Sequence, residues 1–283
     1  MKAAMKTFWL VFKKIIVAAD ADDISGESAK VAYYFFLSLF PFILVLFAFT
    51  GLFGGHVAFD WVMAHLRTAL PGPASDYMES FVRDVTESRR PGVLSLGLAA
   101  MLYTASNIFV ILASGLNTMY NVREHRSWLR RRLFSLAALV ATVVLLTSSA
   151  AGLVVGRPVL AALGLGTVWH VVGWPVSFLG VAALMAVLYV LLPDRSQKGA
   201  WRCVAVGAGA GALLWILATL GFHLYVQRIA AYGRTYGVVG GIIVLLLWLY
   251  LTALSILFGG EVAATLEQEG LLGGRPDGHP PSG

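Results

Sequence analysis

The sequence predicts an all-α integral membrane protein built as a bundle of six transmembrane helices. Three observations support this fold class. Of the 283 residues, 58% are hydrophobic and 13% are charged, which is about half the charged fraction of an ordinary soluble domain. The mean hydropathy of +0.78 means that the apolar side chains exceed what a soluble core of this size would bury. Six apolar segments are also long enough to cross a hydrocarbon layer of about 30 Å.

The six predicted spans account for just over half of the chain. The membrane bundle is therefore predicted to be the domain itself, over residues 31–265, and not the anchor of a soluble body. Residues 266–283 are rich in Gly and Pro, so we expect them to form a disordered cytoplasmic tail. The spans are placed near 31–53, 93–119, 133–155, 168–192, 203–226 and 237–260.

The N-terminal segment, residues 1–30, is predicted to be cytoplasmic and amphipathic. Its larger apolar residues recur at helical spacing, at Phe8, Phe12, Ile15 and Ile16. Lys6 and Lys13 fall on the other face, so the pattern predicts an interfacial helix on the inner leaflet. A signal peptide fits less well, because Lys13 and Lys14 interrupt the apolar stretch after about six residues, whereas such a stretch needs roughly 7–15.

The basic residues predict the orientation in the membrane. Lys and Arg are twice as numerous in the N-terminal segment, the 120–132 and 193–202 loops and the C-terminal tail as in the segments on the other side. Because cytoplasmic loops retain an excess of these residues, we expect a multi-pass protein with both termini cytoplasmic. The net charge of +6 is then explained by contact with anionic lipid headgroups, and no nucleic-acid partner is predicted.

The first outer loop, residues 54–92, is too long for a plain connection. Two short amphipathic helices are predicted within it, at Val57–Leu70 and Ser75–Thr86, and the segment Pro71-Gly72-Pro73 separates them. They form either an outer lid on the bundle or a pair of helices lying on the outer headgroups. The sequence leaves both arrangements open.

A proline within the first span is the most informative feature of that span. Pro41 has no N–H to donate to the carbonyl of Leu37, so the helix should bend there and leave a free acceptor at membrane depth. The bend serves either helix packing or a polar substrate path. The candidate substrate-path residues of this span are Tyr33, Tyr34, Ser38 and Pro41.

The second span carries a stripe of polar side chains. At 100° per residue, four of them fall on one narrow helix face and Asn117 lies at its edge. They provide either interhelical hydrogen bonds, worth about 0.6–2 kcal/mol each, or the lining of a hydrated or headgroup-binding cavity. The stripe consists of Thr104, Asn107, Ser114 and Thr118, and the candidate substrate-path residues here are Thr104, Asn107, Ser114 and Asn117.

Small residues in the last two spans predict close contacts between helices. Gly207 and Gly211 form a GxxxG surface, and Gly237 and Gly241 form a second one. A phosphate-binding role for the glycine run 207–211 is disfavoured, since no strand precedes it and no Gly-Lys-Ser/Thr follows.

Four further residues are candidates for a substrate path. His223 and Gln227 lie one helical turn apart near the outer end of span five, either as a satisfied interfacial pair or as ligands of a polar group. Tyr236 precedes span six. Glu261 follows that span at the inner edge of the bilayer, where an acid is costly unless it is paired or hydrated; we expect an ion pair with the basic 120–132 loop or Arg195, or else a functional gate.

Enzyme signatures are absent from the sequence. There is no HExxH or GxSxG motif and no His pair at metal-ligand spacing. The single Cys203 excludes a disulfide within the chain. We therefore predict no enzyme activity, no catalytic residue, no metal and no cofactor.

Several short motifs occur in a characteristic order. They are Tyr33-Tyr34 through Ser38-Leu39-Phe40-Pro41, Gly115-Leu116-Asn117, Leu191-Leu192-Pro193-Asp194-Arg195, Trp201-Arg202, Tyr236-Gly237, Leu247-Trp248-Leu249-Tyr250 and Gly259-Gly260-Glu261-Val262. Their order and spacing over residues 7–268 resemble the YihY/BrkB family of bacterial inner-membrane proteins. One departure is Tyr103, near which a Trp is expected.

The resemblance implies a six-helix protein of the bacterial inner membrane that supports envelope integrity and handles lipids. The chain is also similar to proteins once labelled ribonuclease BN. RNA cleavage would need acid-base groups or metal-binding carboxylates in an aqueous cleft, and the predicted cytoplasmic loops are too short to build one.

The function expected from these observations is a transporter or translocation component for lipids or lipid-linked envelope precursors. Its partners would be membrane lipids, and its cavity would be lined by span one around Pro41 and by the polar stripe of span two. A non-transporting scaffold that recruits envelope proteins is the alternative, followed by an ion or small-solute channel. The sequence leaves open whether the protein forms a homo-oligomer.

Overall fold

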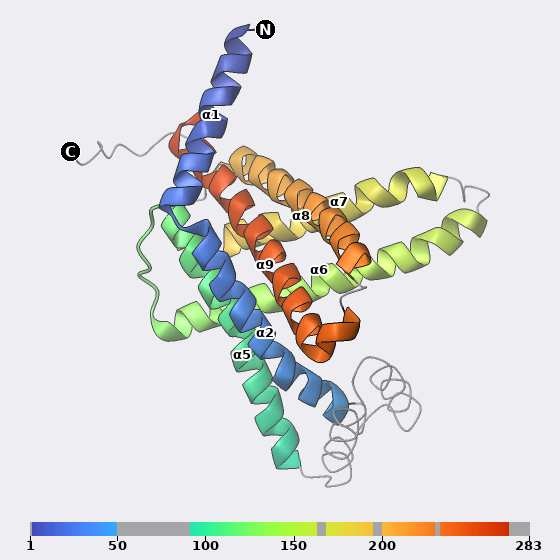
Figure 1. Ribbon diagram of the computed structural model, residues 1–283. Helices are drawn as coiled ribbons and strands as arrows, with labels where there is room; N and C mark the ends of the chain where they lie inside the picture. The colour runs from blue at the N-terminus through green and yellow to red at the C-terminus, as the bar shows by residue number, and fades with distance from the viewer. Residues whose placement is uncertain (1, 50–90, 163–167, 195–199, 230–232, 272–283) are drawn as a thin grey trace. The chain divides into compact units, whose positions relative to one another are not determined.

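The computed structural model describes residues 2–49, 91–162, 168–194, 200–229 and 233–271, and this part of the chain is helical (Figure 1). Each predicted span overlaps one helix, which confirms the all-α class for the described residues. The helices are α1 (Lys2–Ala21), α2 (Ile24–Phe49), α5 (Pro91–Met119), α6 (Trp128–Ala162), α7 (Val168–Leu191), α8 (Trp201–Ile229) and α9 (Gly233–Gln268). The amphipathic helices predicted at Val57–Leu70 and Ser75–Thr86 lie outside the described residues.

Two described helix segments are long and apolar enough to cross a membrane. They are Trp201–Gln227 in α8 and Gly240–Gln268 in α9, with mean hydropathies of 2.0 and 2.5. A shorter apolar segment, Pro175–Leu191, lies in α7. The count of six spans stays a prediction.

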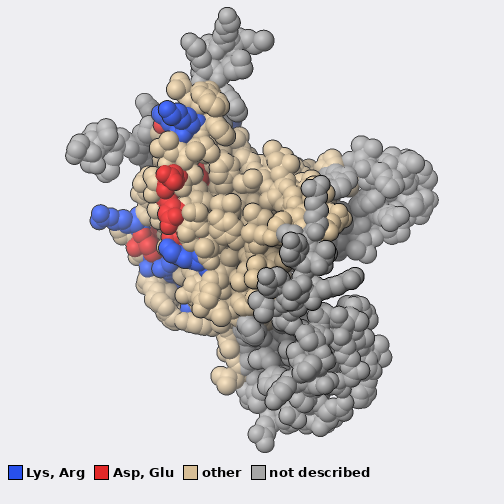
Figure 2. All heavy atoms as spheres, in the orientation of Figure 1, with Lys and Arg blue, Asp and Glu red and all other residues tan. Residues whose placement is uncertain are grey.

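The chain divides into two compact units. Unit 1 comprises Met1–Val31, Phe109–Gly221 and Tyr250–Gly283, and unit 2 comprises Ala32–Ile108 and Phe222–Leu249. Every charged side chain that the structure describes belongs to unit 1. On the face shown in Figure 2 these charges gather along one edge and the remaining described surface is uncharged.

Within unit 1, α8 and α9 approach each other at glycine residues. A Cβ added at Gly207 would overlap the carbonyl oxygen of Gly259 and lie 2.5 Å from the Cβ of Ala263. One turn later, a Cβ at Gly211 would lie 2.9 Å from the carbonyl oxygen of Ser255. The two backbones are therefore nearer than any side chain would permit, which is the geometry that small residues allow in membrane helices.

Polar side chains join α9 to its neighbours in the same region. The fully buried Tyr189 of α7 donates its hydroxyl to the Ile256 carbonyl at 2.6 Å. Trp215 of α8 donates its indole N–H to the Thr252 hydroxyl at 3.2 Å. Both bonds satisfy groups that would be costly to bury unpaired.

The second GxxxG surface, Gly237 and Gly241, differs from the first in the space around it. A Cβ at Gly241 would meet no described atom within 4 Å, and Gly237 lies in α9. The close helix contact therefore involves the first GxxxG surface together with the Gly259 segment.

Helix α1 packs on α8 and α9 through one side only. Ile15 is buried in a cluster with Cys203, Val262 and Leu266, and Lys14 forms an ion pair with Glu269 at 2.6 Å. The predicted apolar face is therefore split in two. Ile15 faces the protein, while Phe12 and Ile16 remain exposed together with Trp9, because their positions on the helical wheel are turned away from Ile15.

The boundary of the C-terminal tail also differs from the prediction. Helix α9 continues through Gln268, Leu266 is buried, and the Cys203 thiol lies 3.3 Å from the carbonyl oxygen of Leu271. The apolar contacts with α1 and α8 extend the ordered helix beyond residue 265. Residues 272–283 lie outside the described part of the chain.

The close approach of α8 and α9 predicts a position-specific effect of adding one methyl group. Gly207→Ala should destabilise the protein by about 1–3 kcal/mol, because backbone atoms of α9 must move. Gly209→Ala is the matched control, since nothing lies within 4 Å of its added Cβ. Thermal unfolding of the purified proteins in detergent measures the difference, and a Gly207→Ala variant as stable as Gly209→Ala would contradict the packing described.

Candidate functional site

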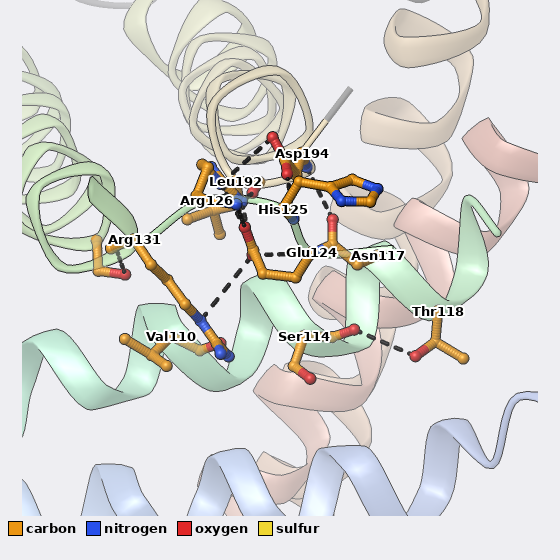
Figure 3. A network of polar contacts seen from close by, with 11 residues as sticks. Val110, Ser114, Asn117, Thr118, Glu124, His125, Arg126, Arg131, Leu192 and Asp194 are labelled. Carbon is orange, nitrogen blue, oxygen red and sulfur yellow. Dashed lines mark hydrogen bonds and ion pairs between the residues drawn. The ribbon is translucent and has the colours of Figure 1, made fainter. Parts of the chain in front are cut away.

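A polar network lies where α5 ends and the chain turns toward α6 (Figure 3). Asn121 has a left-handed φ of 53°, and the Val122 N–H donates to the Asn117 carbonyl at 2.9 Å. This is the hydrogen bond of a Schellman motif, in which asparagine can replace the usual glycine. The motif reverses the chain, so residues 122–127 pass beside the C-terminal end of α7.

Asn117 connects this turn to the end of α7. Its side-chain N–H donates to Glu124 Oε2 at 3.1 Å. Its side-chain oxygen accepts a hydrogen bond of 2.8 Å from the backbone N–H of Asp194. Both ends of the buried amide therefore bind protein groups that lie 7 and 77 residues away in sequence.

Arg126 is the centre of the network. Its side chain is 6% exposed, and it binds both carboxylate oxygens of Glu124, through Nε at 2.8 Å and Nη2 at 3.0 Å. Nη2 also donates to the Leu192 carbonyl at 2.7 Å, and Nε lies 3.5 Å from Asp194 Oδ1. The guanidinium carbon lies 5.1 Å from the centre of the Phe134 ring, a cation–π contact.

The remaining oxygen of Asp194 completes the connection. Oδ2 accepts the His125 backbone N–H at 2.7 Å. From α6, Arg131 donates to the Val110 carbonyl of α5 at 3.0 Å. The network thus joins the C-terminal part of α5, the start of α6 and the end of α7. Its centre is the buried Arg126 guanidinium, which is paired with both Glu124 and Asp194.

Electrostatics favour the ionised form of the central carboxylate. Burial alone would raise the pKa of Glu124, but the hydrogen bonds and the charge of Arg126, with a smaller contribution from Arg131, outweigh burial and lower it. The geometry is that of a bidentate arginine–carboxylate pair. Its role is to hold three chain segments together, and we call this set of residues (Asn117, Glu124, Arg126, Asp194) the arginine clamp.

Sequence reasoning identified only Asn117 among the clamp residues. Glu124 is a lone acid in a strongly basic loop, and Asp194 follows a proline directly after an apolar span. Those two positions were signals that an acid would be paired there, although the loop spacing does not reveal that Arg126 is the shared partner.

Besides the arginine clamp, unit 1 contains a pair of neighbouring carboxyl groups, those of Glu261 and Asp22. Glu261 Oε1 accepts the Thr265 hydroxyl at 2.8 Å, and the Glu261 carboxyl group lies close enough to that of Asp22, at the junction of α1 and α2, for the two groups to interact. The predicted ion pair of Glu261 with the basic 120–132 loop is not among its described contacts, and in that loop Arg126 pairs with Glu124. Arg195, the other predicted partner, lies outside the described residues.

Three hydroxyl groups of the first two spans bond within their own helices. Ser38 donates to the Phe35 carbonyl at 2.7 Å, Thr104 to the Ala100 carbonyl at 2.8 Å, and Thr118 to the Ser114 carbonyl at 3.2 Å. Such bonds satisfy a hydroxyl locally, and the two roles predicted for the stripe stay predictions. Asn107 is half-buried and Ser114 is exposed.

The other candidate residues are dispersed. Tyr33 and Tyr34 are exposed, and their rings meet edge to face with centroids 5.4 Å apart. Helix α2 continues through position 41 to Phe49, so Pro41 does not end it. His223 and Gln227 lie 2.9 Å apart on the exposed side of α8, as predicted for a mutually satisfied pair, and Tyr236 lies in the first turn of α9.

An apolar groove lies between α7 and α8, and its lining residues include none of the candidate substrate-path residues. Its volume is about 530 Å³. Leu179, Val190 and Trp201 on its walls are exposed, so the groove is open to the surroundings. The walls are formed by Phe178, Leu179, Ala182, Ala183, Ala186, Val187, Val190 and Leu191 of α7 and by Trp201, Ala205, Ala208 and Gly209 of α8.

The arginine clamp predicts that Arg126 is more important for stability than its basic neighbours. Arg126→Ala should cost about 3 kcal/mol, because it leaves buried carboxylate and carbonyl groups without their donor. Arg126→Lys should recover only part of this loss, since lysine cannot make the bidentate contact. Arg130→Ala removes the same charge from an exposed position and serves as the control. Equal melting temperatures for Arg126→Ala and Arg130→Ala would contradict the clamp.

Comparison with known proteins places the chain in a family. A family model described as virulence factor BrkB matches residues 15–281. The ribonuclease-like protein YfkH of Bacillus subtilis is 34% identical over 90% of this chain and 93% of its own length. A UPF0761 membrane protein of Rhodospirillum centenum is 27% identical over 85% of this chain and 54% of its own length, and one of Pseudoalteromonas atlantica is 26% identical over 87% and 82%. No solved structure matches. The chain belongs to the BrkB family, which includes membrane proteins.

Proposed function

We propose that this protein binds membrane lipids and takes part in their movement in the bacterial inner membrane. The observation that carries the proposal is the apolar groove between α7 and α8. In a bilayer, this groove would open toward the lipid chains.

The size and chemistry of the groove suit an acyl chain. Its volume of about 530 Å³ lies within the range of roughly 300–1,000 Å³ that is usual for small-molecule sites. The lining residues are aliphatic or aromatic, with no charged side chain among them. A hydrocarbon chain would leave no polar group unsatisfied there, whereas an ion or a sugar would lose its hydration without replacement.

The start of α8 suits a phosphate headgroup. Trp201 forms one end of the groove and is 66% exposed, and tryptophan favours the boundary between lipid and water. Arg202 is also exposed. At 100° per residue it falls beside the face that carries Ala205 and Gly209. A lipid whose chain fills the groove would place its phosphate within reach of this guanidinium.

The charge distribution supports the orientation proposed with this function. The described charged side chains gather at one edge of the face in Figure 2, as expected for an end of the bundle that faces the cytoplasm and anionic headgroups. Cytoplasmic termini and a multi-pass topology belong to the same proposal. Lipids or lipid-linked precursors of the envelope are its proposed cargo, and support of envelope integrity is the proposed outcome.

The scaffold alternative is less well supported. It needs GxxxG surfaces that are free to bind partner proteins; Gly207 and Gly211 are in contact with α9 of the same chain, while Gly241 is open. We favour lipid handling because the groove between α7 and α8 is a preformed apolar site among the described residues.

Filling the groove should reduce lipid binding and movement. Ala205→Phe places a ring between α7 and α8, whereas Val206→Phe adds a ring at the next position, which is exposed and does not line the groove. Reconstituted protein with labelled phospholipids in vesicles provides the measurement. We expect several-fold less photocrosslinked lipid and slower transbilayer movement with Ala205→Phe than with Val206→Phe.

Two results would contradict this function. One is an equal rate of lipid movement in vesicles with and without the protein. The other is equal lipid crosslinking in the two phenylalanine variants, which would mean that the groove does not hold the chain.

A further inference from the structure

Glu261 is a buried acid with an incomplete set of hydrogen-bond donors. The residue is 2% exposed. The Thr265 hydroxyl donates to Oε1 at 2.8 Å, but Oε2 is buried and has no hydrogen-bond partner among the described residues. A buried ionised oxygen without a donor is costly, so the site lacks one hydrogen atom.

Asp22 is the group positioned to supply it. The contacts on either side place the α1–α2 junction against α9, since Ile15 packs with Val262 and a Cβ added at Gly115 would contact both Leu257 and Glu27. The carboxyl groups of Asp22 and Glu261 lie close enough to interact. Two carboxyl groups can form a hydrogen bond with each other only when one of them carries a proton.

We propose that Asp22 and Glu261 form a proton-binding site in which the two carboxyl groups share one proton. The shared proton supplies the missing donor and removes the repulsion between two adjacent negative charges. It thereby fastens the α1–α2 junction, which leads into the first predicted span, to α9. This site is independent of the lipid groove, and either can exist without the other.

The surrounding groups favour a proton over a metal cation. The described partners of Glu261 are one hydroxyl, whose hydrogen is directed at Oε1, and one carboxyl group. Among the described residues, no three His, Cys, Asp or Glu side chains converge on a point. Hard cations prefer six or more oxygen ligands, so this arrangement is too sparse for them.

Other titratable groups around the site are already engaged. From α7, Tyr189 donates to the Ile256 carbonyl. From α2, Glu27 is paired with Lys30 at 2.7 Å. The neighbouring Asp23 accepts the Gly26 N–H as the N-cap of α2. Burial raises the pKa of Asp22, although its interaction with Glu261 opposes that effect, and a raised pKa agrees with a carboxyl that retains a proton.

Infrared spectroscopy of the purified full-length protein tests the shared proton directly. A protonated carboxyl group absorbs at a frequency distinct from that of a carboxylate. At about pH 6, above the ordinary carboxyl pKa of roughly 4, wild-type protein should show this absorption. It should be lost in Asp22→Asn and in Glu261→Gln, and retained in Asp20→Asn, which changes an exposed acid two residues away.

Thermal unfolding provides a second measurement that does not require the spectrum. Because the proton stabilises the folded state and the pKa of Asp22 is raised, this stabilisation is present at low pH and is lost as the pH rises through the folded-state value. The wild-type melting temperature should therefore fall over that window. Asp22→Asn carries a permanent N–H donor, so its melting temperature should fall less, while Asp20→Asn should follow the wild type.

Three outcomes would overturn the proposal. The first is the absence of the protonated-carboxyl absorption from the wild type at about pH 6, and the second is its persistence in Glu261→Gln. The third is its loss when sodium replaces choline at constant ionic strength, which would identify a metal cation as the occupant instead of a proton.

Discussion

The direct backbone contact between α8 and α9 organises unit 1. Because Gly207, Gly211 and Gly259 have no side chains at the crossing, the two helices approach until carbonyl oxygens limit them. The position of α8 in turn sets one wall of the lipid groove, and the position of α9 presents Glu261 to the α1–α2 junction. A membrane offers little hydrophobic force between helices, so dense contact of this kind and a few polar bonds must supply the cohesion.

Polar groups in the described structure are concentrated at helix ends. The arginine clamp joins the ends of α5 and α7 to the start of α6. At the C-terminal end of a helix the last carbonyl groups have no partner within their own helix. The Leu192 carbonyl receives Arg126, and the Met119 carbonyl receives the side chain of Gln268 at 2.9 Å. Within the helices, serine and threonine hydroxyls bond to the preceding turn. Between its ends, α9 receives hydrogen bonds from Tyr189 and Trp215, beside apolar contacts and small residues.

Helix positions were predictable because long apolar runs and the loops between them have strong signatures. Gly207 and Gly211 were also recognisable as a contact surface, since their spacing places them on one helix face. The clamp was not predictable beyond Asn117, because its residues lie far apart in sequence and a positive loop gives no indication of which arginine is buried. A cavity beside Pro41 and the polar stripe stays a prediction. The groove between α7 and α8 was not predicted, because its alanines leave space that a hydropathy pattern cannot distinguish from packed surface.

The described charged side chains all belong to unit 1, so the two units should respond to different properties of their surroundings. Ionic strength, acid and lipid headgroup composition act on charges, so they can alter the clamp, the Lys14–Glu269 pair and the carboxyl pair. Among its described side chains, unit 2 has no Lys, Arg, Asp or Glu. Bilayer thickness and acyl-chain order would therefore act on that unit mainly through its apolar surface.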